Sequence, residues 1–142
     1  MQVKDIMSSR PAYISKETSL QETAQKMEEL DCGFLPVGDG DKLDGVLTDR
    51  DIVLRAVAKG KDLKNTTAGD MLTDRVLYCF EEDSVEEAAR NMREQRVYRL
   101  VVLNNSQEKR LRGVVSLGDI SRKGQYDALV GETAEEISKA SA

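Results

Sequence analysis

The sequence has 142 residues with a net charge of −5, and 33% of its side chains are charged while 39% are hydrophobic. This composition is typical of a globular chain with a hydrophobic core and excludes an intrinsically disordered one. The acidic balance, without a long run of Lys or Arg, argues against binding of nucleic acid through its phosphates. No apolar stretch is long enough for a membrane span or a secretory signal, so we expect a cytoplasmic protein.

The residue types that most often carry catalysis or bind metals are scarce. There is no histidine, which is the usual general acid or base and the commonest metal ligand. The two cysteines, Cys32 and Cys79, lie far apart and form no C-x-x-C pair, so neither a zinc site nor a dithiol redox centre is expected. Their apolar neighbours predict buried thiols in a reducing compartment. We therefore expect neither an enzyme nor a metal-binding protein.

The chain contains an internal duplication. A shift of 65 positions aligns Asp5 with Asp70, Tyr13 with Tyr78, Ser19 with Ser84, Met27 with Met92 and Leu35 with Leu100. A shift of 68 then aligns 43–46 with 111–114 and 51–52 with 119–120. The second copy is thus longer by three residues, and these fall in a polar loop at 104–108. Matches that remain in register over this length indicate two copies of one unit.

Each copy begins with an extended segment, at 12–14 and at 77–80, followed by a helix. Ser19 with Glu22, and Asp83 with Glu86, have the spacing of a helix N-cap and its third residue. The apolar side chains that follow recur at helical spacing and form one face: Leu20, Ala24 and Met27 in the first copy, Val85, Ala89 and Met92 in the second.

Two strands and a closing helix complete each copy. The strands are expected at 33–37 and 43–47, and again at 97–103 and 111–115, and the closing helices begin after Thr48 and Ser116. Because one β-α-β-β-α unit buries little surface alone, we expect an α+β fold of two repeats packed sheet to sheet about a pseudo-two-fold axis. The expected divisions are 1–64 with a connector, 65–124, and a charged C-terminal tail at 125–142, read as a solvated helix or a frayed end.

The most informative motif is the corner between the last strand and the closing helix. It reads Gly-Val-Leu-Thr-Asp-Arg-Asp-Ile at 45–52 and Gly-Val-Val-Ser-Leu-Gly-Asp-Ile at 113–120. Thr48 with Asp51, and Ser116 with Asp119, fit a capping box that any such corner needs. The same groups fit a ribose-phosphate, since the hydroxyl can donate to a phosphate and the carboxylate can accept from two sugar hydroxyls. The spacing leaves both interpretations open.

With these motifs, residues 1–123 resemble a tandem CBS-domain pair, or Bateman module, of the small stand-alone bacterial type. The resemblance rests on the repeated Gly-hydrophobic-hydrophobic-Thr/Ser-x-x-Asp signature, on Asp5-Ile6-Met7 and on Leu35-Pro36-Val37 before a Gly/Asp loop. It implies a sensor that binds AMP, ADP or ATP, with no metal beyond Mg²⁺ accompanying ATP. It also implies a homodimer that acts on a regulated protein which the sequence does not identify.

The resemblance further implies two clefts between the repeats. In the first, Ser116 contacts phosphate and Asp119 holds the ribose hydroxyls, and the residues around them are Tyr98, Arg99, Ala12, Cys32 and Gly33. In the second, Thr48 and Asp51 have these roles, and the residues around them are Arg50, Leu77, Val97 and Tyr98. Phe34 stands where the second copy has Arg99, so the cation favours the Ser116 cleft.

Two other functions remain open. The chain could be a ligand-free module for protein–protein interaction or dimerisation, in which the hydroxyl and carboxylate pairs are only helix caps. An enzyme such as a nucleotidase ranks third, because it needs an acid–base or metal centre. A metal held by Asp49, Asp51 and a phosphate is conceivable, but the sequence shows no assembled site.

Overall fold

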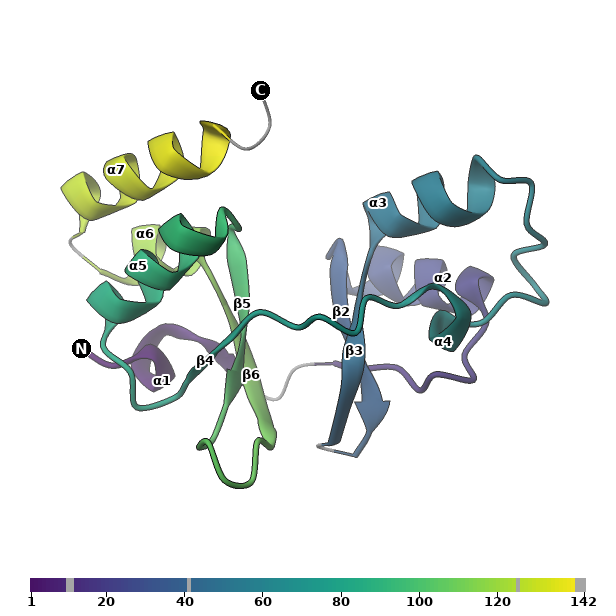
Figure 1. Cartoon of the computed structure of the whole chain (residues 1–142), viewed down its shortest axis with the longest axis horizontal. Coiled ribbons are helices and arrows are strands. Elements are labelled where there is room, and N and C mark those ends of the chain that lie inside the picture. Colours follow the sequence, from purple (N-terminus) through teal and green to yellow (C-terminus); the bar gives the residue numbers. More distant parts are fainter. Residues whose placement is uncertain (10–11, 41, 125, 140–142) are drawn as a thin grey trace. The chain divides into compact units, whose positions relative to one another are not determined.

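The computed structural model describes residues 1–9, 12–40, 42–124 and 126–139 (Figure 1). The chain divides into two compact units: unit 1 comprises Met1–Pro11 and Leu77–Ala142, and unit 2 comprises Ala12–Val76. Each unit has its own core and its own sheet, which confirms the expected α+β class. Within the described residues, no helix has the length and apolar character needed to cross a membrane.

Unit 1 is built on a four-stranded sheet in the order β1-β6-β5-β4, in which β4 is parallel to β5 and the other neighbours are antiparallel. Its helices enclose a core that includes Ile6, Leu100 and Ile120, each at most 1% exposed. Figure 1 shows α5 and α6 beside the sheet and α7 packed outside them. The elements are α1 (Val3–Ile6), β1 (Ser8–Ser9), β4 (Tyr78–Phe80), α5 (Val85–Gln95), β5 (Arg99–Leu103), β6 (Leu111–Ser116), α6 (Leu117–Lys123) and α7 (Asp127–Ser138).

Unit 2 repeats this plan with a smaller sheet. Strands β2 and β3 pair antiparallel, and the outer strands are reduced to single bridges, Ile14 with Val37 and Val46 with Thr73. The closing helix ends in a π-helical turn, where the Ala58 N–H donates to the Val53 carbonyl at 2.9 Å. The elements are α2 (Leu20–Leu30), β2 (Phe34–Asp39), β3 (Lys42–Thr48), α3 (Asp49–Ile52), η1 (Val53–Val57) and α4 (Ala68–Met71).

Each repeat opens with a short helical turn, and each turn packs in the unit that contains the rest of the other repeat. In unit 1, the N–H of Val3 in α1 donates to the Asp83 carbonyl at 2.8 Å. In unit 2, the N–H of Ala68 in α4 donates to the Thr18 carbonyl at 2.8 Å. The compact units therefore differ from the divisions expected at residues 64 and 124, which describe the sequence repeats and stay a prediction.

The signature glycine of each corner faces the backbone that follows an exchanged turn. A Cβ atom on Gly113 would lie 2.5 Å from the carbonyl oxygen of Ser8, and one on Gly45 would lie 2.6 Å from that of Thr73. Ser9 pairs with Gly113 in the sheet, and Thr73 pairs with Val46 beside Gly45. The motif begins with glycine because any side chain there would collide with this neighbouring strand.

The main helices begin with serine caps. Ser19 Oγ accepts from the Glu22 N–H at 3.1 Å, as predicted, and Ser84 Oγ accepts from the Glu87 N–H at 3.1 Å. The prediction that Asp83 caps the second helix is wrong by one residue. Its Oδ2 instead accepts from the Phe80 N–H at 2.9 Å, which closes the turn after β4 and leaves the cap to the next hydroxyl.

The C-terminal tail is a helix, but the prediction that it is solvated or frayed is wrong. Helix α7 packs on α5 and α6, and its Thr133 and Ile137 are at most 1% exposed. Thr133 Oγ1 also accepts from Arg93 of α5 at 3.5 Å. The apolar face is narrow, which explains why the sequence pattern is weak. Gln125 and residues 140–142 of the expected tail lie outside the described residues.

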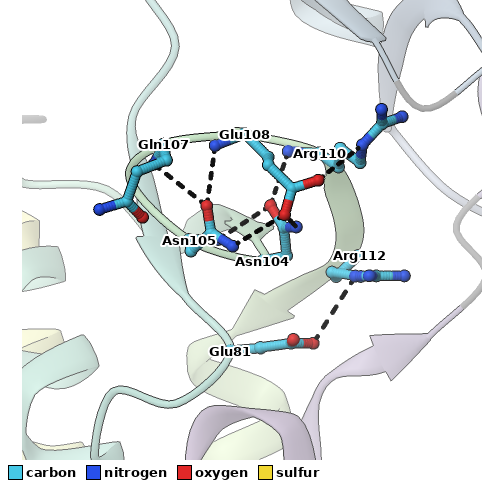
Figure 2. Close-up of polar contacts among 7 residues, drawn as sticks. All are labelled: Glu81, Asn104, Asn105, Gln107, Glu108, Arg110 and Arg112. Atoms are coloured by element: carbon cyan, nitrogen blue, oxygen red, sulfur yellow. Dashed lines mark hydrogen bonds and ion pairs between the residues drawn. The ribbon is translucent and has the colours of Figure 1, made fainter.

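The inserted loop between β5 and β6 is a hydrogen-bonded turn (Figure 2). Asn105 Oδ1 accepts from the N–H groups of Gln107 at 3.0 Å and Glu108 at 2.8 Å. The Glu108 carboxylate accepts from Asn105 Nδ2 at 3.2 Å and from Arg110 Nε at 3.2 Å. These hydrogen bonds lower the pKa of Glu108, and the bond from Asn105 contributes most. The three additional residues thus form an ordered cap on the hairpin.

Candidate ligand-binding site

Each strand-to-helix corner contains a complete capping box. In unit 1, Ser116 Oγ accepts from the Asp119 N–H at 3.1 Å, and Asp119 Oδ2 accepts from the Ser116 N–H at 2.9 Å. In unit 2, Thr48 and Asp51 make the same two bonds, both at 3.0 Å. The capping interpretation is therefore confirmed in both corners. In each box, the carboxylate uses only its Oδ2 atom, so Oδ1 is left for another partner.

Sheet register places the expected phosphate ligands of unit 1 side by side. Arg99, the first residue of β5, lies opposite Ser116, the last residue of β6. The corner is held by the Leu117 N–H, which donates to the Tyr98 carbonyl at 2.9 Å. Directly opposed residues of an antiparallel pair project from the same face of a sheet, so the Arg99 and Ser116 side chains are neighbours.

These side chains line a pocket of about 360 Å³ within unit 1. Three predicted site residues, Tyr98, Arg99 and Ser116, contribute to its wall. Asp119 is not itself a lining residue and is only 5% exposed, but it bonds to two of the lining residues, Ser116 and Arg122. The remaining lining residues are Leu117, Gly118, Ser121 and Val130.

The equivalent corner of unit 2 also has a pocket, of about 420 Å³, which includes the predicted residues Cys32 and Gly33. Asp49 lines it, and its carboxylate occupies the space above Gly33, where a Cβ atom would lie 2.6 Å from Oδ2. The predicted residues Thr48, Arg50 and Asp51 are not among the residues that line this pocket. Besides Cys32, Gly33 and Asp49, the lining residues are Ala24, Met27, Glu28, Asp31, Ile52 and Val53.

The two pockets differ in charge. Arg99 and Arg122 line the pocket of unit 1, whereas Glu28, Asp31 and Asp49 line the pocket of unit 2. A carboxylate-lined pocket repels a phosphate, while arginine binds one with charge-assisted hydrogen bonds. The charges therefore agree with the expectation that the Ser116 corner is the better anion site.

The other predicted residues flank the cores. Ala12 and Cys32 pack against the core of unit 2, and Leu77 and Val97 pack against the core of unit 1. Each expected cleft draws on residues of both units, so its assembly stays a prediction.

Five residues that line the unit 1 pocket were not predicted: Leu117, Gly118, Ser121, Arg122 and Val130. Arg122 lies three residues after Asp119, a helical spacing that could have indicated an ion pair. Val130 comes from α7, whose weak sequence pattern gave no such indication.

The two cysteines differ in burial. Cys79 is buried, which raises the pKa of its thiol to about 12, with Asp83 as a smaller cause. Cys32 is half-buried, so the prediction of buried thiols holds fully for Cys79 and only in part for Cys32. In the part of the chain that the structure describes, no three His, Cys, Asp or Glu residues are placed to hold a metal ion.

The chain is similar to Hypoxic response protein 1 of Mycobacterium tuberculosis, with 38% identity over 128 residues that cover 89% of this chain and 87% of that protein. The crystal structure of that protein superposes with a TM-score of 0.75 over 87% of this chain and 98% of the other, and it contains two coordinated zinc ions. The absence of a metal from the present protein thus stays a prediction.

Two further solved structures hold adenosine-containing ligands. The CBS-domain pair of MJ0100, in complex with methylthioadenosine and S-adenosylmethionine, is 29% identical with a TM-score of 0.75, over 87% of this chain and 94% of that one. CBSX2 in complex with AMP is 25% identical with a TM-score of 0.72, over 86% and 94%. The family model of the CBS domain matches residues 3–57 and 68–125. The chain therefore belongs to the CBS-domain family and contains two copies of its domain.

Proposed function

We propose that this protein is a regulatory module that reversibly binds an adenosine nucleotide at the pocket of unit 1. The observation that carries the proposal is Asp119, a buried carboxylate whose Oδ1 atom is not needed for the helix cap. A ribose offers two neighbouring hydroxyls as donors to that oxygen. The pocket wall supplies a hydroxyl from Ser116 and a cation from Arg99 for the phosphates.

The family members with bound ligands support the chemical class. AMP is bound in CBSX2, and methylthioadenosine and S-adenosylmethionine are bound in the CBS pair of MJ0100. The arginines of the present pocket favour ligands with phosphates, so we rank AMP, ADP and ATP above S-adenosylmethionine, with Mg²⁺ accompanying ATP.

We infer a binding role and not a catalytic one. The carboxylate and hydroxyl at the site bond to each other's backbone, so they act as ligands and caps instead of a general acid–base pair. Binding would shift the population of conformations or oligomers, and a regulated protein would respond to that shift.

A homodimer is the assembly that we propose. The π-helical turn of unit 2 exposes Val53, Leu54 and Val57, each at least 46% exposed. Apolar side chains on one helical turn favour a symmetric contact with a second copy. Sedimentation of the wild type and of Val57→Glu tests this: the wild type is expected as a dimer and the variant as a monomer, and equal masses would contradict the proposed surface.

Thermal unfolding with AMP, ADP, ATP, NADH and S-adenosylmethionine tests the ligand. A ligand that binds only the folded state at 100 times its Kd adds about 2.7 kcal/mol to the free energy of unfolding. We expect Asp119→Ala to abolish the shift and Asp51→Ala to retain it. Both variants lose the carboxylate bond of an equivalent capping box, so Asp51→Ala controls for the loss of a cap.

No shift with any of these ligands at millimolar concentration would contradict the proposal. The complete capping boxes would then be the whole function of the two corners, and a ligand-free interaction module would be the better account. Incubation with ATP and Mg²⁺ tests catalysis directly, and we expect no release of phosphate.

A further inference from the structure

The oxygen that a ribose would need is already bound. Arg122 Nη2 donates to Asp119 Oδ1 at 2.7 Å, while Asp119 Oδ2 is held by the helix cap. The Arg122 side chain is 67% exposed and that of Asp119 only 7%, so an exposed cation covers a buried anion. A ligand that binds Asp119 through its sugar must first displace this arginine.

The local sequence provides space for the Arg122–Asp119 ion pair. Gly118 lies beneath the guanidinium, and a Cβ atom there would be 2.9 Å from Arg122 Nη1 and 3.5 Å from Ser116 Oγ. A side chain at position 118 would therefore push the guanidinium away.

The corresponding contact in unit 2 is looser. Positions 50 and 54, which match Gly118 and Arg122 in the duplication, hold an arginine and a leucine. Asp51 pairs instead with Arg55, at 3.5 Å, and its side chain is 20% exposed. The close ion pair is thus a property of the unit 1 corner and not of the repeat in general.

Once displaced from Asp119, Arg122 can pair with a phosphate of the bound ligand. Arg122 lines the same pocket as Arg99, whose side chain makes no ion pair or hydrogen bond with any other residue that the structure describes. Two guanidinium groups in one pocket suit a phosphate chain, since each can bind two oxygens at once. A nucleoside without phosphates would release Arg122 to water and gain nothing in exchange.

We propose that Arg122 is a specificity residue that closes the Asp119 site to unphosphorylated nucleosides and transfers to the phosphates when a nucleotide binds. This inference rests on the proposed function and specifies how that site discriminates between ligands. Binding of the sugar breaks the Arg122–Asp119 ion pair in every case. Only a phosphorylated ligand restores a partner to the arginine.

Calorimetric titration with adenosine and with ADP tests this proposal in three variants. Arg122→Met keeps the apolar stem and removes the charge, so adenosine should bind up to about fivefold more tightly and ADP about tenfold more weakly. Gly118→Ala displaces the guanidinium without removing it, so adenosine should gain affinity relative to ADP. Lys123→Met is the matched control, because it removes one positive charge from the same helix outside the pocket, and its ratio of adenosine to ADP affinity should equal that of the wild type.

The outcomes separate the two proposals. Nucleotide binding by the wild type with an unchanged adenosine-to-ADP ratio in Arg122→Met would overturn the role of Arg122 and leave the proposed function standing. An equal loss of both ligands in that variant would also overturn it, because it would show a merely structural side chain. If the wild type binds neither ligand, both proposals fail.

Discussion

Helix α7 should be an integral part of unit 1, and Ile137→Ala tests this. Ile137 is 1% exposed and belongs to the same core cluster as Met92 of α5 and Ile120 of α6. The substitution removes three carbon atoms from a closed environment. At about 0.8 kcal/mol per buried methylene-sized group, the lost transfer free energy is about 2.4 kcal/mol.

Two smaller effects modify this figure. The cavity left behind increases the destabilisation, and the higher helix propensity of alanine reduces it by a few tenths of a kcal/mol. We therefore expect the free energy of unfolding to fall by about 2–3 kcal/mol. Glu132→Ala is the control, because Glu132 is exposed on the same helix, and its effect should stay within about 0.5 kcal/mol.

Urea unfolding measures the free energy, and hydrogen exchange locates the change. In Ile137→Ala, amides of α5 should lose protection, because α7 packs directly on that helix. Amides of α2 should keep theirs, because α2 belongs to the separate core of unit 2. If Ile137→Ala is as stable as Glu132→Ala, the packing of α7 and the argument from its burial are wrong.

Three further outcomes follow from the structure. A thiol reagent at pH 8 should modify Cys32 rapidly and Cys79 only on unfolding, because burial raises the Cys79 pKa to about 12; equal rates would contradict that burial. The lowered pKa of Glu108 stabilises the folded loop at pH values above 4.5, the pKa of this group in the unfolded chain. This stabilisation is lost as the pH falls through the lower pKa of the folded loop. Glu108→Gln should therefore flatten the acid side of a plot of unfolding free energy against pH. Gly113→Ala should destabilise by about 1–3 kcal/mol in thermal unfolding because its Cβ meets the backbone of β1, whereas Gly131→Ala, which meets nothing, should stabilise slightly.

The local features of the fold could be predicted because each depends on residues close in the sequence. Repeated serine caps, apolar helix faces and strand-to-helix corners lie within a few positions of one another, and the structure has them in both copies. The cap of α5 was misplaced because Asp83 and Ser84 each have a glutamate three residues later. Only the turn that Asp83 closes with Phe80 decides between them.

The features that escaped prediction depend on contacts between distant segments. The exchange of α1 and α4 gives no local signal, because each turn has only four residues and both repeats carry it. The docking of α7 rests mainly on two buried side chains, Thr133 and Ile137, which is too few to produce a clear periodicity. At the site, the sequence predicted Ser116, Asp119 and Arg99, and Arg122 was missed although its helical spacing from Asp119 permits an ion pair.

In the strand-to-helix corner of unit 1, one carboxylate oxygen of Asp119 has a structural role and the other has the proposed functional role. Oδ2 completes the helix cap, so the corner forms without a ligand and folding does not depend on occupancy. Oδ1 is paired with a side chain that is largely exposed, so its partner can be exchanged with little change to the core. In the proposed role, a ligand would replace this one contact and leave the cap in place, so its binding would be reversible. The corresponding carboxylate of unit 2 keeps the cap but lies beside an acidic pocket, so the duplicated corners retain one fold while they differ in the charge around them.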